Sequence, residues 1–232
     1  MLSIRQVSKR YPHRRGYVTA LEDITLEVTQ GDFLAVVGPS GSGKSTLLFT
    51  IGGMLSPSAG KVWVDGQSCY DLPVSQRTRL RRDKIGFVFQ SFHLIPYLTA
   101  LENVQVPLYL QGLSEIEQRR RAVSLLDRVG LWDRLDHKPC ELSIGQQQRV
   151  ALARTLANDP PLILADEPTG NLDPDTRRHV VSFLEELHRE GRTIVLVTHD
   201  PHVAQRARRV ARLVNGRLES ATEQSPAIAQ VA

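Results

Sequence analysis

The sequence predicts an α/β protein in which an all-helical segment interrupts a sheet-forming core. Short, continuously apolar runs, typical of strands buried in a parallel sheet, occur in the first and last thirds of the chain. Helical periodicity dominates the part between them. Two runs near the N-terminus alternate apolar and polar residues, as antiparallel strands with one solvated face do. These observations predict a mixed sheet, an antiparallel β part at the N-terminus and an inserted helical part.

The expected elements follow one another in this order. The strands are expected at residues 2–8, 21–28, 33–38, 61–66, 84–90, 162–166, 193–199, 210–214 and 217–219. The helices are expected from Lys44 onward and at residues 100–110, 114–129, 143–156 and 174–188. The last of these helices opens with Asp173-Pro174, an N-cap residue followed by proline at the first helical position.

These elements predict a single domain over residues 1–219. Its core and β part take up residues 1–90 and 159–219, and its helical part lies at about 91–158. The small, polar residues 220–232 are expected to form a flexible tail.

Composition narrows the class of protein. The chain has 232 residues, 41% of them hydrophobic and 23% charged, which excludes general disorder. A formal charge of +4 is too small to predict binding to nucleic acid, so no nucleic-acid partner is expected. Cys69 and Cys140 lie far apart and outside any C-x-x-C pair, which fits a reduced, cytosolic setting. No apolar run reaches the roughly 18 residues of a membrane-spanning helix, so membrane contact is expected only through a partner.

A phosphate-binding loop is predicted between the strand at 33–38 and the helix from Lys44. The segment "GPSGSGKST" matches G-x-x-x-x-G-K-[ST], the P-loop of nucleoside triphosphatases (NTPases), in the structural context that this motif requires. Its backbone N–H groups face phosphate oxygens, Lys44 adds a positive charge, and the Ser45 hydroxyl is a ligand for Mg²⁺. The predicted ATP-binding residues of this loop are Gly38, Pro39, Ser40, Gly41, Ser42, Gly43, Lys44, Ser45 and Thr46.

Polar residues that end other buried strands complete the predicted catalytic site. Asp166 and Glu167 end the strand "LILAD", at the sheet edge where ligands bind in open α/β sheets. Asp166 is expected to hold Mg²⁺ and Glu167 to activate the attacking water. His199 ends the next strand and is able to reach the γ-phosphate, although a lone histidine there is often structural. Gln90 ends "GFVF" and is a candidate contact for Mg²⁺ or for the water.

The stretch "CELSIGQQQR" predicts a helix start that suits an anion. Ser143 followed by Gln146 three residues later matches the capping box, and apolar residues then recur at helical spacing. Such a small, hydroxylated helix tip presents unpaired N–H groups and partial positive charge.

Taken in order, "GPSGSGKST", Gln90, "LSIGQ", "LILADEP", "NLD" and His199 resemble the nucleotide-binding subunit of an ATP-binding cassette (ABC) transporter. The resemblance covers nearly the whole chain. It implies the RecA-like core of a P-loop NTPase, with ATP and Mg²⁺ as cofactors. It implies a head-to-tail homodimer in which the γ-phosphate bound to one copy meets the signature of the other. It also assigns Asp173 to the dimer interface and Tyr11 to adenine stacking, with Tyr17 as the local alternative. The signature residues that act in trans are Ser143, Ile144, Gly145 and Gln146.

One signature residue departs from the family pattern. The usual sequence is Leu-Ser-Gly-Gly-Gln, whereas here Ile144 replaces the first glycine. Isoleucine fits a right-handed helical turn and keeps its N–H, but it does not fit a position of positive φ. We therefore expect a competent site if Ile144 lies in the helix.

Within the family, "FVFQSFHLIPYLTALENV" and "TGNLDP" most resemble the lipoprotein-release and macrolide-export branch, whose cell-division relatives are also close. This implies export or extraction of a lipoprotein, peptide or amphiphilic drug, at the cytoplasmic face of the inner membrane. A transmembrane permease subunit is expected to dock near Gln90–Leu101. The apolar residues of that stretch are equally compatible with the core of the helical part.

Three other functions remain open from sequence alone. The first alternative is an ATPase that controls a membrane-bound cell-division or cell-wall complex without transport, which needs the same residues. A soluble ABC-type ATPase acting on DNA or ribosomes is disfavoured, because the chain has neither a long coiled-coil insertion nor a second cassette. A nucleotide-sensing module without catalysis is disfavoured by the presence of both Glu167 and His199.

Overall fold

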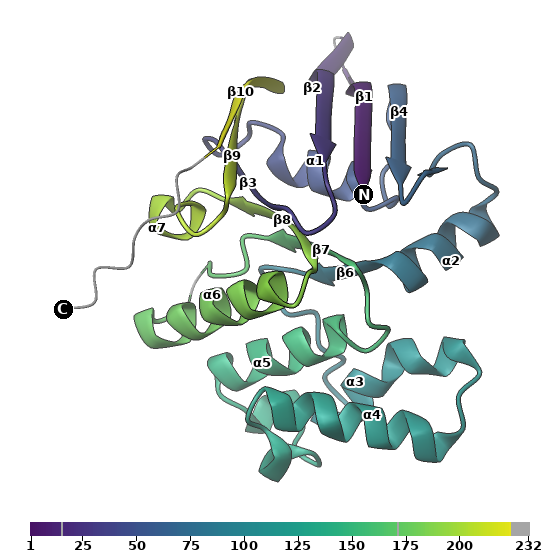
Figure 1. Ribbon diagram of the computed structural model, residues 1–232, viewed down its shortest axis with the longest axis vertical. Helices are drawn as coiled ribbons and strands as arrows, with labels where there is room; N and C mark the ends of the chain where they lie inside the picture. Colours follow the sequence, from purple (N-terminus) through teal and green to yellow (C-terminus); the bar gives the residue numbers. More distant parts are fainter. Residues whose placement is uncertain (15, 171, 224–232) are drawn as a thin grey trace.

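The computed structural model describes residues 1–14, 16–170 and 172–223, which form two sheets and a group of helices (Figure 1). The first sheet is antiparallel and has the strand order β2-β1-β4-β5. Its strands are β1 (Leu2–His13), β2 (Gly16–Val28), β4 (Ala59–Val64) and β5 (Gln67–Ser68). The second sheet has the order β10-β9-β3-β8-β7-β6. Its strands are β3 (Phe33–Val37), β6 (Ile85–Val88), β7 (Leu162–Asp166), β8 (Thr193–Thr198), β9 (Arg209–Val214) and β10 (Arg217–Glu223).

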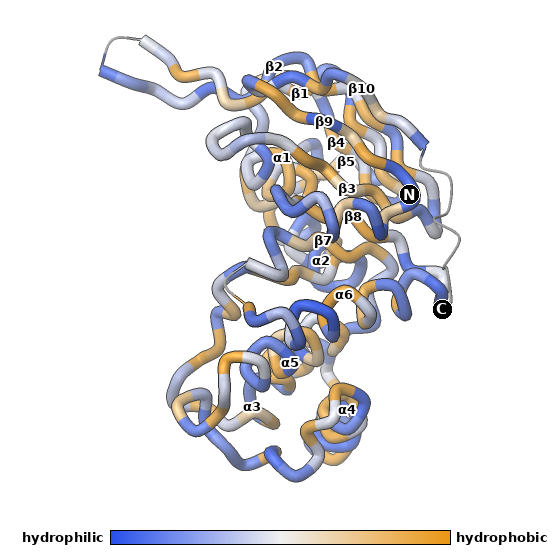
Figure 2. Tube along the Cα trace, turned by 90° about the vertical axis from the view of Figure 1, so that its left-hand side faces the viewer, coloured by the Kyte–Doolittle hydropathy of each residue, from blue (hydrophilic) through white to orange (hydrophobic). Residues whose placement is uncertain are grey.

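The second sheet is parallel except for β10, which pairs with β9 in antiparallel fashion. Its central strands are almost entirely apolar, as is typical of strands covered on both faces. On one face, Leu34 and Leu164 pack with residues of the antiparallel sheet and with Leu48 of α1 (Lys44–Ile51). On the other face, Ala35 and Ile163 pack in a second cluster with the helices that cover that side. Figure 2 shows the resulting concentration of apolar residues on β3, β7 and β8.

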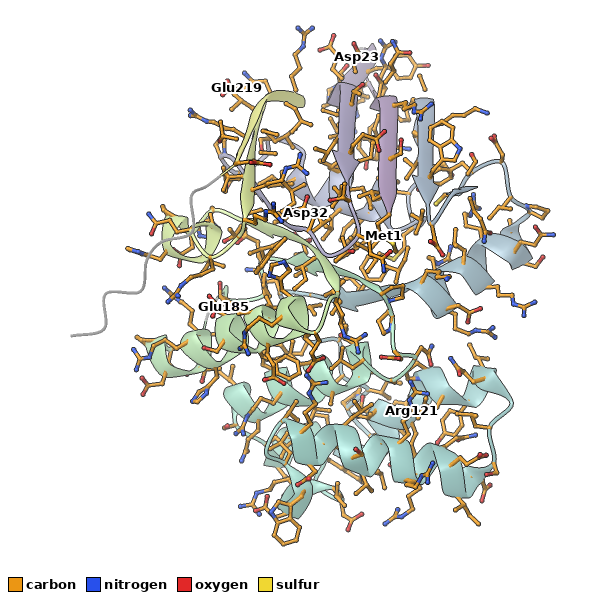
Figure 3. All side chains as sticks on the ribbon, in the orientation of Figure 1. Met1, Asp23, Asp32, Arg121, Glu185 and Glu219 are labelled. Atoms are coloured by element: carbon orange, nitrogen blue, oxygen red, sulfur yellow. The ribbon has the colours of Figure 1, made fainter. Side chains whose placement is uncertain are left out.

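Helices occupy the space beyond the second sheet, and Figure 3 shows that side chains fill the spaces between these layers. The α-helices are α2 (Val74–Lys84), α3 (Ala100–Gln105), α4 (Glu115–Arg128), α5 (Ile144–Thr155), α6 (Pro174–Arg189) and α7 (Pro201–Ala204). Three 3₁₀ helices are η1 (Val106–Gln111), η2 (Trp132–Arg134) and η3 (Pro139–Glu141). Figure 1 places α3 and α4 at one end of the molecule, farther from the second sheet than α6.

Helix α5 joins the helical end of the molecule to the core. Leu152 and Leu156 belong to the cluster that covers the second sheet. Val150 and Ala153, on another face of the same helix, belong to the cluster formed with α3 and α4. A displacement of α5 therefore affects both clusters.

The predicted fold class is confirmed, but several elements differ from the predictions, among them the following. Helix α2 was not expected, because Leu80 is its one buried residue and the sequence therefore lacks an apolar period. The helix expected over 100–110 ends at Gln105, and the tighter turns of η1 begin at Val106, next to Pro107, which has no N–H. The flexible tail expected from residue 220 is wrong for its first residues, since β10 pairs with β9 up to Glu223. Residues 224–232 of that predicted tail lie outside the described residues.

In the described part of the chain, no helix combines the length and apolar character needed to cross a membrane.

Candidate nucleotide-binding site

The phosphate loop connects β3 to α1 through backbone conformations that require glycine. Gly43 has φ 102°, and a Cβ atom there would lie 2.3 Å from the carbonyl oxygen of Ala20. A Cβ atom on Gly38 would lie 2.0 Å from the carbonyl oxygen of Leu213. The first turn of α1 carries no acidic residue, so its N–H groups are not opposed by negative charge. The predicted loop thus has the shape and polarity of a phosphate site.

Lys44 folds back over this loop. Its ammonium group donates hydrogen bonds to the carbonyl oxygens of Gly38 (2.9 Å) and Pro39 (3.0 Å), and the residue is 8% exposed. These are weak partners for a buried ammonium group, because neutral carbonyls do not compensate its charge as an anion does. The arrangement places a positive charge where phosphate oxygens are expected.

Ser45 and Asp166 meet at the Mg²⁺ position predicted from the sequence. The Ser45 hydroxyl donates a 3.0 Å hydrogen bond to Oδ1 of Asp166, which joins α1 to the end of β7. Burial raises the pKa of Asp166, as does the nearby charge of Glu167, whereas the Ser45 hydrogen bond and Lys44 lower it. Mg²⁺ binds oxygen ligands, and these two oxygens fit that preference.

The carboxylate of Glu167 is fixed by its backbone and by His199. Glu167 has φ 46°, and its N–H donates to the carbonyl oxygen of Val197 at 2.9 Å. Oε1 of Glu167 lies 2.9 Å from Nδ1 of His199 at the end of β8. A positive φ in a residue other than glycine costs about 1–3 kcal/mol and is concentrated at functional sites.

Gln90 lies beyond β6 in a bend, not at the end of the strand as predicted, because β6 ends at Val88. A Cβ atom on Gly170 would lie 2.8 Å from Nε2 of Gln90, so the glutamine packs against that glycine. Gly170 in turn donates from its N–H to the carbonyl oxygen of Glu167 at 3.0 Å. The structure therefore brings Gln90 to the loop that carries Glu167.

The signature forms the capping box expected from the sequence. Oγ of Ser143 accepts from the N–H of Gln146 (3.2 Å), and Oε1 of Gln146 accepts from the N–H of Ser143 (2.9 Å). Ile144 is the first residue of α5, has a right-handed helical conformation and is 59% exposed. This meets the conformational condition set by its replacement of glycine. Among the described residues, no hydrogen bond connects this capped end to the phosphate loop.

The two remaining predicted contacts are Asp173, which precedes α6, and Tyr11, which lies in a strand. Asp173 caps α6 and accepts from the N–H groups of Asp175 and Thr176; its pKa is lowered by the hydrogen bonds of Thr176. Tyr11 was expected in a loop after the first strand, but it lies within β1, opposite Val18, because the hairpin continues to His13. The hairpin extends away from the body of the molecule (Figure 2).

Tyr17, the alternative to Tyr11, is also in the hairpin, opposite Pro12, and is 75% exposed. Tyr11 is 37% exposed, with the ammonium group of Lys9 5.2 Å from the centre of its ring. The choice between the two tyrosines remains a prediction. Asn171 of the "NLD" motif lies outside the described residues.

One residue that sequence reasoning missed connects two parts of the site. The guanidinium of Arg154, near the end of α5, donates to the carbonyl oxygens of Phe92 (2.6 Å) and His93 (2.7 Å). Burial lowers the pKa of Arg154. The segment after Gln90 is thereby attached to the helix that begins with the signature. A single arginine in an ordinary helical pattern gave no signal of this role.

A glycine-rich loop between a buried parallel strand and a helix, with carboxylates at the neighbouring strand end, defines a P-loop nucleoside triphosphatase. The family model described as "ABC transporter" matches residues 21–170, and the chain belongs to this family. The predicted ABC-type ATP-binding cassette, an ATPase, is thereby confirmed.

Two relatives align with nearly the whole of this chain. The macrolide export ATP-binding/permease protein MacB 1/2 of Paracoccus denitrificans (strain Pd 1222) is 48% identical over 94% of this chain and 33% of its own length. The uncharacterized ABC transporter ATP-binding protein MJ0796 of Methanocaldococcus jannaschii is 47% identical over 94% of this chain and 95% of its own length. The chain thus spans about a third of the length of the MacB relative.

Solved structures give the same result. A dimeric, post-hydrolysis structure of the ATP-binding cassette MJ0796 bound to ADP and Pi has a TM-score of 0.90 and 44% identity, and the match covers 96% of this chain and 98% of that one. CbiO1 from Clostridium perfringens, part of the ABC transporter complex cbiONQ, has a TM-score of 0.84 and 30% identity over 96% of this chain and 88% of its own.

Proposed function

We propose that the chain pairs head to tail with a second copy, so that each of two ATP molecules lies between the phosphate loop of one protomer and the signature of the other. The observation that carries this proposal is the capped end of α5. Ser143 and Gln146 form reciprocal hydrogen bonds between side chain and backbone, and Ile144 begins a right-handed helix. Among the described residues, this end of α5 makes no hydrogen bond to the phosphate loop of its own chain. A helix N-terminus without a local anion fits an anion supplied by the partner. Asp173 lies at the same interface.

The residues of each half-site divide the chemistry between them. Residues 38–46 bind the phosphates, and Lys44 exchanges its carbonyl partners for phosphate oxygens. Ser45 and Asp166, with Gln90 near, would hold Mg²⁺, which would supply positive charge beside the phosphate oxygens. Glu167 accepts a proton from the attacking water at its carboxylate. His199 fixes that carboxylate and faces the γ-phosphate.

We place the contact with a transmembrane permease near Gln90–Leu101. A groove of about 430 Å³ adjoins this segment at Phe89. It is lined by apolar residues and also by the polar or charged residues Thr78, Arg81, Arg82, Arg154, Thr155 and Asn158, of which Arg154 holds the segment. Its apolar lining residues are Met54, Ile85, Phe87, Phe89, Val106, Pro107 and Leu110. Phe92 and Leu94 pack into the clusters of the molecule, whereas Tyr97 is 74% exposed. The partner surface is therefore a part of this segment, not all of it.

The name of the MacB relative gives macrolide export by an ATP-binding/permease protein. For this chain we propose a permease partner that exports or extracts an amphiphilic drug, a lipoprotein or a peptide, with the cassette at the cytoplasmic face of the inner membrane. The cell-division or cell-wall role remains the second candidate, since it uses the same site. The proposed partition into a core (1–90, 159–219) and a helical part (about 91–158) puts the phosphate loop in the core and the signature in the helical part. No nucleic-acid partner is proposed.

The test of the composite site is the dependence of ATP hydrolysis on protein concentration. With saturating Mg-ATP, the rate per chain should fall as the protein is diluted below the dimer dissociation constant. A rate per chain that stays constant down to concentrations at which sedimentation shows only monomer would contradict the proposal. A pull-down from detergent-solubilised membranes, with mass spectrometry of the co-purifying subunit, distinguishes a permease from a cell-division partner.

A further inference from the structure

Gln148 is a buried polar residue that none of the roles above uses. It lies on α5, one helical turn after Ile144, and is 0% exposed. Its Nε2 donates a 3.0 Å hydrogen bond to the carbonyl oxygen of Pro168, the residue that directly follows Glu167. This bond therefore joins the helix that begins with the signature to the loop that carries the proposed catalytic carboxylate.

The loop around Glu167 depends on such bonds because its backbone is strained. A residue with a side chain at φ 46° keeps this conformation only where its surroundings impose it. Two bonds within the core contribute: the N–H of Glu167 donates to Val197, and the N–H of Gly170 donates to Glu167. The bond from Gln148 is the contribution of α5.

Helix α5 is packed closely enough to transmit a displacement of its first turn. A Cβ atom on Gly145 would lie 2.7 Å from Oγ1 of Thr176, so the helix start touches α6 with no spare room. Leu152, one turn beyond Gln148, is fixed in the cluster that covers the second sheet. Gln148 lies between these two contacts. A ligand that shifts or holds the end at Ser143 therefore acts on Gln148, because a packed helix moves as a unit.

We propose that Gln148 is a positioning residue that couples the signature to Glu167 of the same chain. When the partner's nucleotide engages the end of α5, Gln148 holds the Pro168 carbonyl and keeps the Glu167 carboxylate in its productive orientation. Each protomer thus senses the nucleotide bound to its partner and sets its own catalytic carboxylate accordingly. The inference rests on the proposed role of Glu167 as the base.

The first test is Gln148→Met, which keeps an unbranched side chain of similar length and removes the N–H donor. We expect kcat for ATP hydrolysis to fall about tenfold, since small displacements of a catalytic group cost this much or more. The KM for ATP should stay within about twofold, because the phosphate loop is unchanged.

Gln118→Met is the matched control. Gln118 on α4 is also a buried glutamine (6% exposed), and its Nε2 donates to the carbonyl oxygen of Leu113 at 2.8 Å. In both glutamines Oε1 has no partner among the described residues. The two substitutions should lower the melting temperature similarly, but Gln118→Met should leave kcat unchanged. An equal loss of kcat in both variants overturns the inference.

A double-mutant cycle separates positioning from a general structural effect. In a Glu167→Gln background, Gln148→Met should not reduce the residual rate further, because the group that it positions is already disabled. A further tenfold loss in that background shows that Gln148 does not act through Glu167 and overturns the inference. If Gln148→Met is unfolded at the assay temperature, Gln148→Leu serves in the same cycle, since its smaller apolar side chain also has no N–H to donate.

The outcomes also distinguish this inference from the proposed function. Full turnover by Glu167→Gln alone contradicts the proposed base. An inactive Glu167→Gln together with a fully active, folded Gln148→Met contradicts only the coupling through Gln148.

Discussion

Nδ1 of His199 lies 2.9 Å from Oε1 of Glu167, so a side-chain contact joins the ends of the neighbouring strands β7 and β8. The side chain of Glu167 is 14% exposed and that of His199 is 67% exposed. In the tautomer with hydrogen on Nδ1, the ring donates to the carboxylate and leaves Nε2 on the open side. In this pair Glu167 is the oriented carboxylate and His199 is the residue that faces solvent. Substitution of each residue tests its role.

Substitution of the carboxylate is the first prediction. Glu167→Gln should bind ATP with unchanged affinity but lose hydrolysis by about 10²–10⁴-fold, the usual contribution of a general base. Because the nucleotide is then not consumed, the variant should elute as a dimer in size-exclusion chromatography with Mg-ATP and as a monomer without it. Turnover at the rate of the unmodified protein would reject Glu167 as the base.

His199→Ala should lower kcat by about 10- to 100-fold, because the carboxylate loses its fixed orientation and the phosphate loses a contact. The KM for ATP should change less than kcat, since the loop at residues 38–46 is intact. The comparison is His202→Ala, which removes an exposed histidine three residues further on, in α7. Equal effects of the two substitutions would show that the contact with Glu167 has no catalytic role.

The phosphate loop and the acidic strand end were predictable because their information is local. "GPSGSGKST" needs only its own glycines and the adjacent strand and helix, and Asp166 follows directly from an apolar run. The capping box of Ser143 and Gln146 spans four residues and was confirmed for the same reason.

Contacts between distant segments were not predictable in the same way. The contact between Glu167 and His199 depends on the parallel register that places Asp166 opposite Val197, and nothing in either segment states that register. Helix α2 was missed because its sequence is polar on all sides. Gln148 is one of three adjacent glutamines, and nothing in the sequence distinguishes it from its neighbours; its burial depends on the fold, which brings Pro168 to its side chain.

Removal of the phosphate-loop charge is the third prediction. Lys44→Ala should weaken ATP binding by at least about tenfold, because a charge-assisted hydrogen bond to phosphate contributes roughly 1.5–3 kcal/mol. Isothermal titration calorimetry measures the affinity directly. Lys61→Ala is the control. Lys61 lies in β4 of the antiparallel sheet, is exposed, and forms an ion pair with Asp71. Unchanged affinity in Lys44→Ala would count against the assignment of the loop.

The raised pKa of Asp166 predicts a stability that depends on pH in the absence of nucleotide. Since burial raises the pKa in the folded state, the folded protein binds more protons than the unfolded chain, and ionisation of Asp166 costs stability as the pH rises. Asp166→Asn should therefore raise the melting temperature by a few degrees at pH 7 while abolishing hydrolysis. The gain should shrink as the pH is lowered towards the ordinary pKa of an aspartate, because both states then carry the proton.

Differential scanning fluorimetry of the two proteins across this pH range checks the prediction. The same experiment with Mg-ATP should reverse the order, because ligands that bind only the folded state stabilise it and Asp166 contributes to that binding. A melting temperature of Asp166→Asn that lies below that of the unmodified protein at pH 7 without nucleotide would contradict the reasoning from burial.

The last prediction concerns the start of α5, where substitution of two adjacent signature residues by alanine should have different effects: one substitution should impair the protein and the other should not. A methyl group at Gly145 meets Oγ1 of Thr176 at 2.7 Å, so Gly145→Ala should displace α5 from α6, at a cost of about 1–3 kcal/mol in stability. Ile144 is 59% exposed and helical. Ile144→Ala should therefore leave the free energy of unfolding almost unchanged and the rate of ATP hydrolysis within about twofold of that of the unmodified protein. Measured in the Glu167→Gln background, Gly145→Ala should also lose the ATP-dependent dimer, whereas Ile144→Ala should keep it. A dimer that survives Gly145→Ala and disappears with Ile144→Ala would show that the isoleucine side chain, and not the capped backbone, makes the contact with the partner's nucleotide.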